Sequence, residues 1–258
     1  MLVLRSLVFN VLFYLVLLAL MIVGLPATLF GRKGVFFLAN IWAHASIFLM
    51  RVVCNLRVEY RGLENIPTGG YLLAAKHQSF LETFSLLPNT PDFAIILKRQ
   101  LAYVPLFGLY LIASNQIAIN RAKGHSAMAQ ILQKAGEVLR AGRQVYIYPE
   151  GTRRTPGAKP AYKYGVAALY AANNVACLPV ALNTGLFWGR RGFARRPGVA
   201  VIEYLPPIPP GLDREAFARR LEDTIETACR RLNAEALRID PSLAIALDND
   251  SVSAPASP

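Results

Sequence analysis

Two short segments of this sequence contain side chains that could carry out acid–base chemistry. The first runs from 75 to 83 and contains His77 and, five residues later, Glu82. An apolar, strand-like run precedes His77, and a helical pattern follows it. A carboxylate that binds one ring nitrogen fixes the histidine tautomer and leaves the other nitrogen available as a general base. The pair fits a histidine–carboxylate dyad of the kind used in acyl transfer, and a structural loop histidine with satisfied hydrogen bonds is the alternative interpretation of His77.

A helix-capping role is the alternative interpretation of Glu82. Ser79 is a good N-cap residue, and a glutamate three positions later completes a capping box. If the helix begins near Phe80, His77 lies just outside its N-terminus. There the partial positive charge of the helix disfavours an imidazolium and keeps the base neutral.

The second segment is a strand-like run that ends at Pro149 and continues as Glu150, Gly151, Thr152 and Arg153. Gly151 permits a close backbone approach, and the Arg153 guanidinium matches the geometry of a phosphate. A plain polar turn would account for the glycine and the threonine, but not for an acid and a base together.

Two further segments carry a weaker signal. Asn120 and Arg121 follow a strand-like run and place a second guanidinium at a strand end, although a solvated loop arginine is an equally good interpretation. The run 178–182 is an apolar strand for which core packing is the default interpretation.

The elements that must position these segments alternate between strands and helices. Apolar runs predict strands at Leu56–Tyr60, Tyr71–Ala75, Phe93–Lys98, Gln116–Ile119, Gln144–Tyr148, Ala176–Leu182 and Val199–Tyr204. Helical spacing of apolar residues predicts helices over 128–139 and, after a cap at Asp213, over 217–232. This alternation predicts an α/β fold, a single layered domain with a mixed, largely parallel sheet flanked by helices.

Two apolar runs precede this domain, at 7–30 and 35–53. The first meets the length of about 20 residues that a bilayer-crossing helix needs. A cleavable signal peptide is the alternative, but its apolar core is shorter, about 7 to 15 residues. We expect a two-helix membrane module over 1–53, the α/β domain over 54–240 and a disordered tail over 241–258, where polar, small and proline residues accumulate.

The cations beside these runs bear on topology. Arg5, Arg32 and Lys33, and then Arg51 and Arg57, mark every flank as preferring the cytosol. A hairpin that spans the bilayer would place Arg32 and Lys33 outside. We therefore favour a membrane-embedded helical hairpin that enters one leaflet and returns, with the following domain cytosolic.

Composition narrows the class of partner. The chain has 28 Lys and Arg against 16 Asp and Glu, for a net charge of +12. Such an excess indicates binding to nucleic acid, to an anionic membrane or to an anionic substrate. The alternative is that the charge serves solubility alone. The apolar N-terminus favours the membrane, and no nucleic-acid-binding motif is present. Three scattered cysteines and three scattered histidines argue against a metal site and indicate reduced thiols of a cytosolic domain.

Taken together, these segments resemble the lysophosphatidic acid acyltransferase family, the PlsC-type glycerolipid acyltransferases. The family's first block, a histidine, four residues and an acid, is matched by His77 and Glu82. The second block ends in an arginine, matched by Arg121, and Glu-Gly-Thr-Arg is matched in full by residues 150–153. An apolar run with a proline is matched around Pro179, and the order of the blocks agrees over roughly residues 56 to 205.

The resemblance implies an enzyme that transfers a fatty acyl group from acyl-CoA or acyl carrier protein to the sn-2 hydroxyl of 1-acylglycerol 3-phosphate, giving phosphatidic acid. His77 would be the general base, with Glu82 stabilising its imidazolium. Arg121 and Arg153 would hold the phosphate, with Lys98 a lesser candidate, while Glu150 and Thr152 position the glycerol. No cofactor or metal is implied, and the G-x-S-x-G elbow of a covalent mechanism is absent. The implied location is the cytoplasmic face of the inner or plasma membrane.

This sequence departs from the family pattern at two places. Glu82 stands where the family usually has aspartate, and the second block is polar at Asn115 and Gln116, where glycine and apolar residues are more frequent. These departures affect the prediction of which lysolipid headgroup is bound more than the prediction of acyl transfer itself. A lyso-ornithine lipid or another lysolipid is therefore the alternative acceptor. A non-catalytic membrane lipid-binding protein and a basic nucleic-acid-binding protein are the alternatives from other classes.

A basic cluster late in the chain lacks a single interpretation. Arg190, Arg191, Arg195 and Arg196 lie beside Trp188 and Phe193. The cluster suits anionic lipid headgroups and interfacial anchoring. It suits equally the acidic face of acyl carrier protein, the phosphates of CoA, or a plain solvated loop.

Overall fold

The computed structural model describes residues 1–119 and 124–248. The strands are β1 (Leu56–Arg61), β2 (Leu72–Ala75), β3 (Phe93–Lys98), β4 (Ile117–Ile119), β5 (Gln144–Ile147), β6 (Cys177–Leu182) and β7 (Gly198–Tyr204). The helices are α1 (Leu2–Val23), α2 (Gly31–Cys54), α3 (Leu81–Ser85), α4 (Phe107–Ala113), α5 (Gly124–Arg140), α6 (Tyr164–Asn173), α7 (Thr184–Phe187), α8 (Arg214–Ile239) and α9 (Ile245–Asp248). Short 3-10 helices are η1 (Leu25–Phe30), η2 (Leu63–Asn65), η3 (Leu87–Asn89), η4 (Arg99–Tyr103) and η6 (Pro241–Ala244).

The strands form one sheet in the order β1-β7-β6-β2-β5-β3-β4. All neighbouring strands are parallel except β6 and β7, which are antiparallel. The expected mixed, largely parallel sheet is therefore confirmed. Because β6, β2, β5, β3 and β4 run in the same direction, their carboxyl ends meet at one edge, where α/β proteins place ligands.

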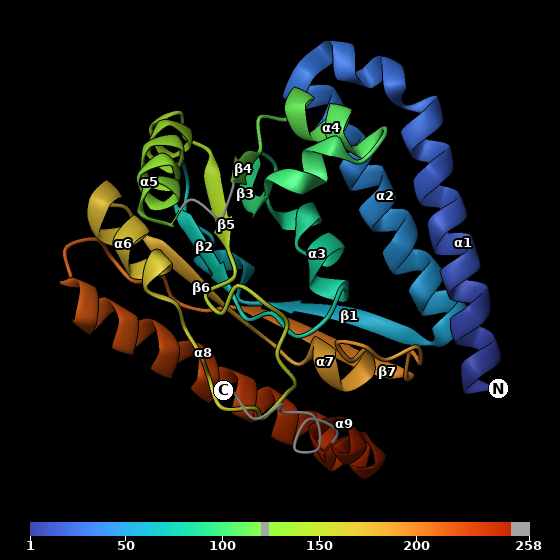
Figure 1. Cartoon of the computed structure of the whole chain (residues 1–258). Helices are drawn as coiled ribbons and strands as arrows, with labels where there is room; N and C mark the ends of the chain where they lie inside the picture. Colours follow the sequence, from blue (N-terminus) through green and yellow to red (C-terminus); the bar gives the residue numbers. More distant parts are fainter. Residues whose placement is uncertain (120–123, 249–258) are drawn as a thin grey trace.

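Helices cover both faces of the sheet (Figure 1). Side chains alternate between the faces, so in β2 Leu73 and Ala75 join the apolar core beneath α1, α2 and α3. Leu72 and Ala74 join the opposite core, beneath α5, α6 and α8. Strands buried on both faces carry nearly continuous apolar runs, which is why sequence predicted them so well. Each of the seven expected strands is observed with both ends within one residue of its expected bounds.

The N-terminal helices α1 and α2 form a hairpin that packs against the α/β domain. Phe9, Phe13 and Met50 are at most 2% exposed and belong to the same core as Phe84 of α3. The rings of Phe13 and Phe84 lie 5.7 Å apart, and Phe36 lies 4.9 Å from Phe93 of β3. By length and composition both segments, Leu2–Val23 and Leu25–Cys54, are apolar enough to cross a membrane.

Both ends of the hairpin contact the α/β domain. At the turn, Arg32 forms a 3.7 Å ion pair with Asp92, and the Tyr110 hydroxyl donates to the Met21 carbonyl at 2.8 Å. At the other end, the Arg195 amide donates to the Ser6 hydroxyl at 2.9 Å. The hairpin therefore lies along the domain for its whole length.

The expected helices are also present, and others were not anticipated. Residues 128–139 lie in α5, and Asp213 caps α8 by accepting a 2.8 Å hydrogen bond from the Ala216 amide. We did not expect α4, α6 or α7. Residues 241–248, assigned from sequence to a disordered tail, form η6 and α9 with Leu243 buried; residues 249–258 lie outside the described residues.

Candidate active site

The carboxyl ends of three adjacent parallel strands converge on one site. His77 follows β2, Tyr148 follows β5 and Thr184 follows β6. Two positions before these residues lie Ala75, Tyr146 and Leu182, which belong to the apolar core beneath the hairpin. Side chains two positions apart on a strand point to the same face. The alternation therefore brings all three side chains to the same face of the same edge.

His77 and Glu82 form the expected dyad. The His77 Nδ1 atom lies 2.8 Å from Glu82 Oε1, and the imidazole is 17% exposed, whereas the carboxylate is fully buried. A carboxylate accepts this bond from Nδ1–H, which leaves the Nε2 lone pair available to accept a proton. This is the geometry of a positioned general base.

Glu82 is held by four hydrogen bonds in total. Its Oε1 atom also accepts from the backbone amides of Gln78 and Ser79, each at 2.7 Å, and Oε2 accepts from the Thr184 hydroxyl at 2.8 Å. The bond from the Ser79 amide to Glu82 is one of the two bonds of a capping box. In place of the second bond, from the Glu82 amide to the Ser79 hydroxyl, the Leu81 amide donates to that hydroxyl at 3.1 Å. Capping and orientation of the histidine are thus performed by the same carboxylate.

The following helix contributes less than the sequence indicated. The helix α3 has only five residues, Leu81–Ser85. Because the helix dipole grows with the number of aligned peptides, a five-residue helix supplies little of the expected positive potential at His77. The hydrogen bonds of Glu82 are the stronger constraint on this ring.

Tyr148 completes the first layer around the base. Its ring stacks on the His77 imidazole, with centroids 3.9 Å apart and 17° between the planes. Burial raises the pKa of Tyr148, and the nearby Glu82 carboxylate raises it further. The phenol is therefore neutral and offers a flat surface against which the imidazole is fixed.

The turn after β5 carries the second expected motif. The Gly151 amide donates to the Tyr148 carbonyl at 2.8 Å, which closes a turn with Pro149 at its second position, and Gly151 has a φ of +66°. The next residues reach the base directly: the Arg154 amide donates to the His77 carbonyl at 2.8 Å. Arg153, half-buried, and Thr152, exposed, lie immediately before this bond.

Arg153 and Arg154 have different environments. Arg154 donates to the Lys159 carbonyl at 2.9 Å and lies 3.8 Å from Glu150. Within the parts of the chain that the structure describes, Arg153 has neither a carboxylate partner nor a side-chain hydrogen bond. Arg153 is therefore the guanidinium of this turn that is available to an anion.

Glu150 lies in a buried ionic network and not at the open side of the turn. Its carboxylate is 1% exposed and lies 3.0 Å from Lys76 Nζ, which also contacts Glu226 of α8 at 2.6 Å. The Tyr162 hydroxyl donates to the same Glu226 carboxylate at 2.9 Å. Burial lowers the pKa of Lys76, but the two carboxylates outweigh burial and hold it above its ordinary value. The expected contact of Glu150 with the glycerol is not supported by this arrangement, because the carboxylate is occupied.

The remaining expected residues are distributed around the edge. Lys98 is exposed at the carboxyl end of β3, one strand beyond β5, whereas Arg121 lies outside the described residues. Two members of the basic cluster do not lie at the surface: Trp188 and Arg195 are buried, and the guanidinium of Arg195 lies 4.0 Å from the indole ring centre. Phe193 and Arg191 are exposed.

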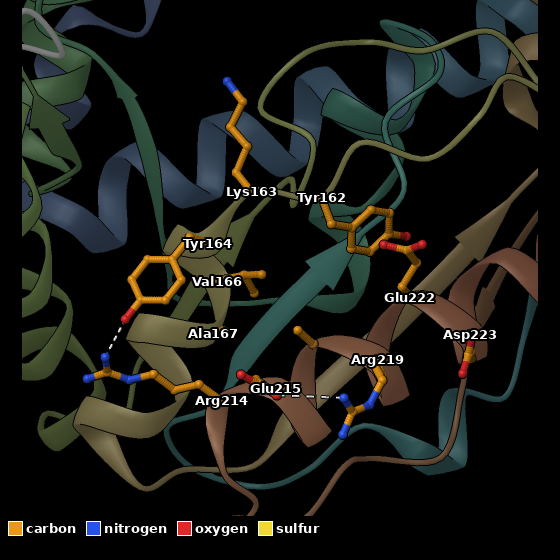
Figure 2. Close-up of a pocket in the computed structure, with 11 residues that line it drawn as sticks. Tyr162, Lys163, Tyr164, Val166, Ala167, Arg214, Glu215, Arg219, Glu222 and Asp223 are labelled. Carbon is orange, nitrogen blue, oxygen red and sulfur yellow. Dashed lines mark hydrogen bonds and ion pairs between the residues drawn. The ribbon is translucent and has the colours of Figure 1, made fainter.

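A cavity of about 310 Å³ lies elsewhere, between α6 and α8. Figure 2 shows its rim, where Tyr164 and Glu215 interact with Arg214 and Arg219. Neither His77 nor Glu82 lines it, so it is separate from the dyad. Among the described residues, no group of three His, Cys, Asp or Glu side chains could hold a metal ion.

Comparison with known proteins decides the family. Residues 57–183 match the Acyltransferase family model. A 1-acyl-sn-glycerol-3-phosphate acyltransferase of Pseudomonas aeruginosa is 38% identical over 172 residues, which cover 67% of this chain and 67% of that protein. This chain belongs to the PlsC-type 1-acylglycerol-3-phosphate acyltransferase family. A chloroplastic family member from Arabidopsis thaliana is 30% identical, and the match spans 74% of this chain but 54% of that protein.

The fold agrees with this assignment. The crystal structure of PlsC from Thermotoga maritima superposes with a TM-score of 0.75 and 20% sequence identity, over 91% of this chain and 98% of that one. The expected fold, enzyme class and family are confirmed for this PlsC-type acyltransferase.

Four residues of this candidate site were not anticipated from the sequence: Lys76, Tyr148, Thr184 and Glu226. Tyr148 could have been found from the alternation of β5, which places it on the face of Tyr146. Thr184 and Glu226 lie far from the dyad in sequence, and no local pattern marks them.

Proposed function

We propose that this acyltransferase moves a fatty acyl group from acyl-CoA or acyl carrier protein to the sn-2 hydroxyl of 1-acyl-sn-glycerol 3-phosphate, giving phosphatidic acid. The observation that carries the proposal is the 2.8 Å bond between His77 and Glu82, next to the turn that carries Arg153 and is hydrogen-bonded to the His77 carbonyl. The site combines a positioned base with a cation suited to a phosphate.

The chemistry needs one base and no covalent enzyme intermediate. Nε2 of His77 accepts the proton of the sn-2 hydroxyl as its oxygen attacks the thioester carbonyl carbon. The C–O bond forms, the C–S bond breaks, and the imidazolium returns its proton to the leaving thiolate. Glu82 stabilises the imidazolium in the interval, because its carboxylate already holds Nδ1–H.

The remaining residues bind and position the acceptor. Arg153 holds the phosphate, together with Arg121 and Lys98. Gly151 and Thr152 present the turn to the glycerol, and Gly151 does so in a left-handed conformation that favours glycine. Glu150 fixes this turn through Lys76 and does not touch the substrate. Correct placement matters, because a shift of about 1 Å at a reacting group can cost on the order of a hundredfold in rate.

The hairpin would hold the enzyme at the surface of one leaflet, on the cytoplasmic side. A hairpin that spans the bilayer would carry residues 24–33 to the far side, yet Arg32 and Met21 contact Asp92 and Tyr110 of the α/β domain. An α/β domain with solvated loops does not cross the bilayer with them. Both lysolipid and acyl chain reside in the leaflet that the hairpin enters.

The first experiment measures acyl transfer to 1-acylglycerol 3-phosphate by the purified full chain. We expect His77→Ala and Glu82→Gln each to lower kcat by about 10⁴-fold, by analogy with triads that lose a member. Glu64→Gln, at an exposed glutamate of η2, is the matched control and should behave as wild type. A His77→Ala protein that keeps wild-type turnover would refute the mechanism.

A panel of acceptors and donors identifies the preferred substrates. The acceptors are 1-acylglycerol 3-phosphate, a lyso-ornithine lipid and monoacylglycerol. Each is tested with acyl-CoA and with acylated acyl carrier protein as the donor. We expect the highest kcat/KM for 1-acylglycerol 3-phosphate. A preference for the lyso-ornithine lipid would keep the chemistry and overturn the assigned acceptor.

Hairpin topology is tested by labelling Lys33→Cys in cells. The three native cysteines are buried, so a membrane-impermeant maleimide reports position 33 alone. We expect no labelling from outside and retention of the protein in the membrane after alkaline carbonate extraction. Labelling exclusively from outside would rule out a hairpin confined to the cytoplasmic leaflet.

A further inference from the structure

We infer that the segment Arg99–Ala113, comprising η4 and α4, is a second membrane-binding element that inserts into the same leaflet as the hairpin. The inference rests on the proposed membrane location and adds a contact surface within the catalytic domain. Six large apolar side chains of this segment are exposed: Leu101, Tyr103, Val104, Phe107, Leu109 and Ile112. Tyr103 is 70% exposed and Ile112 67%. Exposed apolar patches of this kind mark interaction surfaces.

The apolar surface of this segment is continuous with the hairpin. The Tyr110 hydroxyl donates to the Met21 carbonyl at 2.8 Å, and α4 packs against both η1 and α2. Figure 1 places α4 beside the turn that joins α1 to α2. In that turn Leu29 is 85% exposed and Phe30 75%. Exposed apolar side chains therefore lie on two elements in contact, the hairpin turn and α4, and this adjacency to the membrane hairpin favours a lipid leaflet as the occupant.

The charged residues beside this segment are cationic, as expected for contact with anionic lipid headgroups. Lys98 and Arg99 are exposed immediately before the apolar run, and no acidic residue occurs between 93 and 119. An apolar centre with cations at its rim is the pattern of interfacial segments, whose cations meet anionic headgroups while the apolar side chains enter the acyl layer.

This surface would set the orientation of the active site. The segment follows directly from β3, and β3 is separated from β2 by β5 alone in the sheet. Anchoring 99–113 at the headgroup layer therefore holds the edge that carries His77 against the membrane surface. The hairpin alone fixes the distance of the domain from the membrane, and the second contact fixes its rotation about the hairpin axis.

Single-cysteine labelling tests the insertion directly, because the three native cysteines are buried. Ile112→Cys probes the segment, Phe30→Cys the hairpin turn, and Ile239→Cys, at an 87% exposed position of α8, serves as the water-facing control. Each is labelled with a polarity-sensitive nitrobenzoxadiazole dye and reconstituted in vesicles of phosphatidylcholine and phosphatidylglycerol, with or without doxyl-labelled lipid. Activity toward detergent-solubilised substrate verifies that each labelled protein is folded.

We expect the labels at 112 and 30 to shift to shorter wavelength and to be quenched by doxyl lipid, while the label at 239 is unaffected. Quenching at 30 without quenching at 112 overturns this inference and leaves the hairpin intact. Absence of quenching at both overturns the hairpin insertion as well. A wavelength shift at 112 without doxyl quenching indicates a second copy of the chain on this face and likewise overturns the inference.

Kinetics provide a second readout. We expect the double variant Leu109→Asp, Ile112→Asp to raise KM for lysolipid in vesicles by about tenfold, because two apolar side chains no longer enter the acyl layer. Activity toward substrate in detergent micelles should be unchanged, as should both activities of Ile239→Asp. Equal losses in vesicles and micelles would indicate damage to the fold and would contradict a membrane-specific role.

Discussion

The imidazole of His77 lies flat against the phenol ring of Tyr148, with 3.9 Å between the ring centroids. The two residues follow adjacent parallel strands, β2 and β5, and point to the same face of the sheet. The Glu82 carboxylate fixes one edge of the imidazole and Tyr148 fixes its plane. The orientation of the imidazole therefore depends on two independent contacts from different parts of the chain.

Replacing Tyr148 separates the contribution of the ring from that of the hydroxyl. Tyr148→Leu removes the stacked surface, and we expect kcat to fall by about 10- to 100-fold as the imidazole gains freedom. Tyr148→Phe keeps the stack and removes only the hydroxyl, so its kcat should stay within about threefold of wild type. Steady-state kinetics of the two variants decide the matter, and equal losses would contradict a role for stacking.

Thr184 supports the dyad through the second oxygen of Glu82. Thr184→Val leaves this fully buried carboxylate oxygen without its 2.8 Å donor, which should cost about 1–3 kcal/mol of stability and lower kcat. Thr184→Ser restores the hydroxyl and should recover most of both. Denaturant unfolding and kcat are measured in parallel. If the serine variant is as impaired as the valine variant, packing rather than the hydrogen bond is responsible.

Arg153 and Arg154 form a matched pair for testing phosphate recognition. Arg153→Gln should raise KM for 1-acylglycerol 3-phosphate by about 10- to 100-fold, the worth of a charged hydrogen bond, and should leave KM for monoacylglycerol unchanged. Arg154→Gln, whose side chain is held by Lys159 and Glu150, should not discriminate between the two acceptors. The prediction fails if Arg153→Gln weakens both acceptors to the same extent.

Lys76 forms ion pairs with two buried carboxylates, and its loss should be costly. Lys76→Met leaves Glu226 without its cation and Glu150 with only the 3.8 Å contact to Arg154, and we expect about 3–5 kcal/mol of destabilisation by denaturant unfolding. Lys159→Met, at an exposed lysine, is the control and should change little. A loss below about 1 kcal/mol would show that the network adds nothing to stability.

The same lysine predicts an alkaline limit to stability. Because its pKa is raised in the folded state, Lys76 holds its proton more tightly there than in the unfolded chain. Its contribution is complete below the unfolded value of about 10.4 and is lost as pH rises through the folded value. Wild type should therefore lose stability above about pH 10 more steeply than Lys76→Met, and parallel curves would contradict the shift.

Features encoded locally could be predicted from the sequence. The strands were found because strands buried on both faces, such as Cys177–Leu182, need nearly continuous apolar runs. The His77–Glu82 pair was found because the two residues are only five positions apart, His77 in the loop after β2 and Glu82 at the start of α3. Helix α4 was missed because it is short, follows Pro105 and contains Gly108, and because its exposed apolar side chains leave no amphipathic pattern.

Features created by long-range contacts could not be predicted. The partners of Glu82 and Lys76 include Thr184 and Glu226, which reach the site through strand order and the packing of α8. Nor does a sequence reveal that Trp188, two residues before Arg190, is covered by Phe9 and Phe13 of α1. Burial of that tryptophan depends on the docked hairpin, so composition alone could not decide between the interpretations of the cluster.

The position of β1 at the sheet edge has a consequence for biosynthesis. β1 continues directly from the hairpin, and its neighbour is β7, with Leu56–Arg61 paired to Gly198–Glu203. A nascent chain therefore delivers α1 and α2 to the lipid while most of the sheet is still unsynthesised, and the ribosome must proceed past residue 203 before β1 gains its neighbour. Until then the apolar underside of the hairpin, with Phe13 and Met50, has only lipid or a chaperone to cover it. Partition into the bilayer and completion of the catalytic sheet are consequently successive steps of a single maturation pathway.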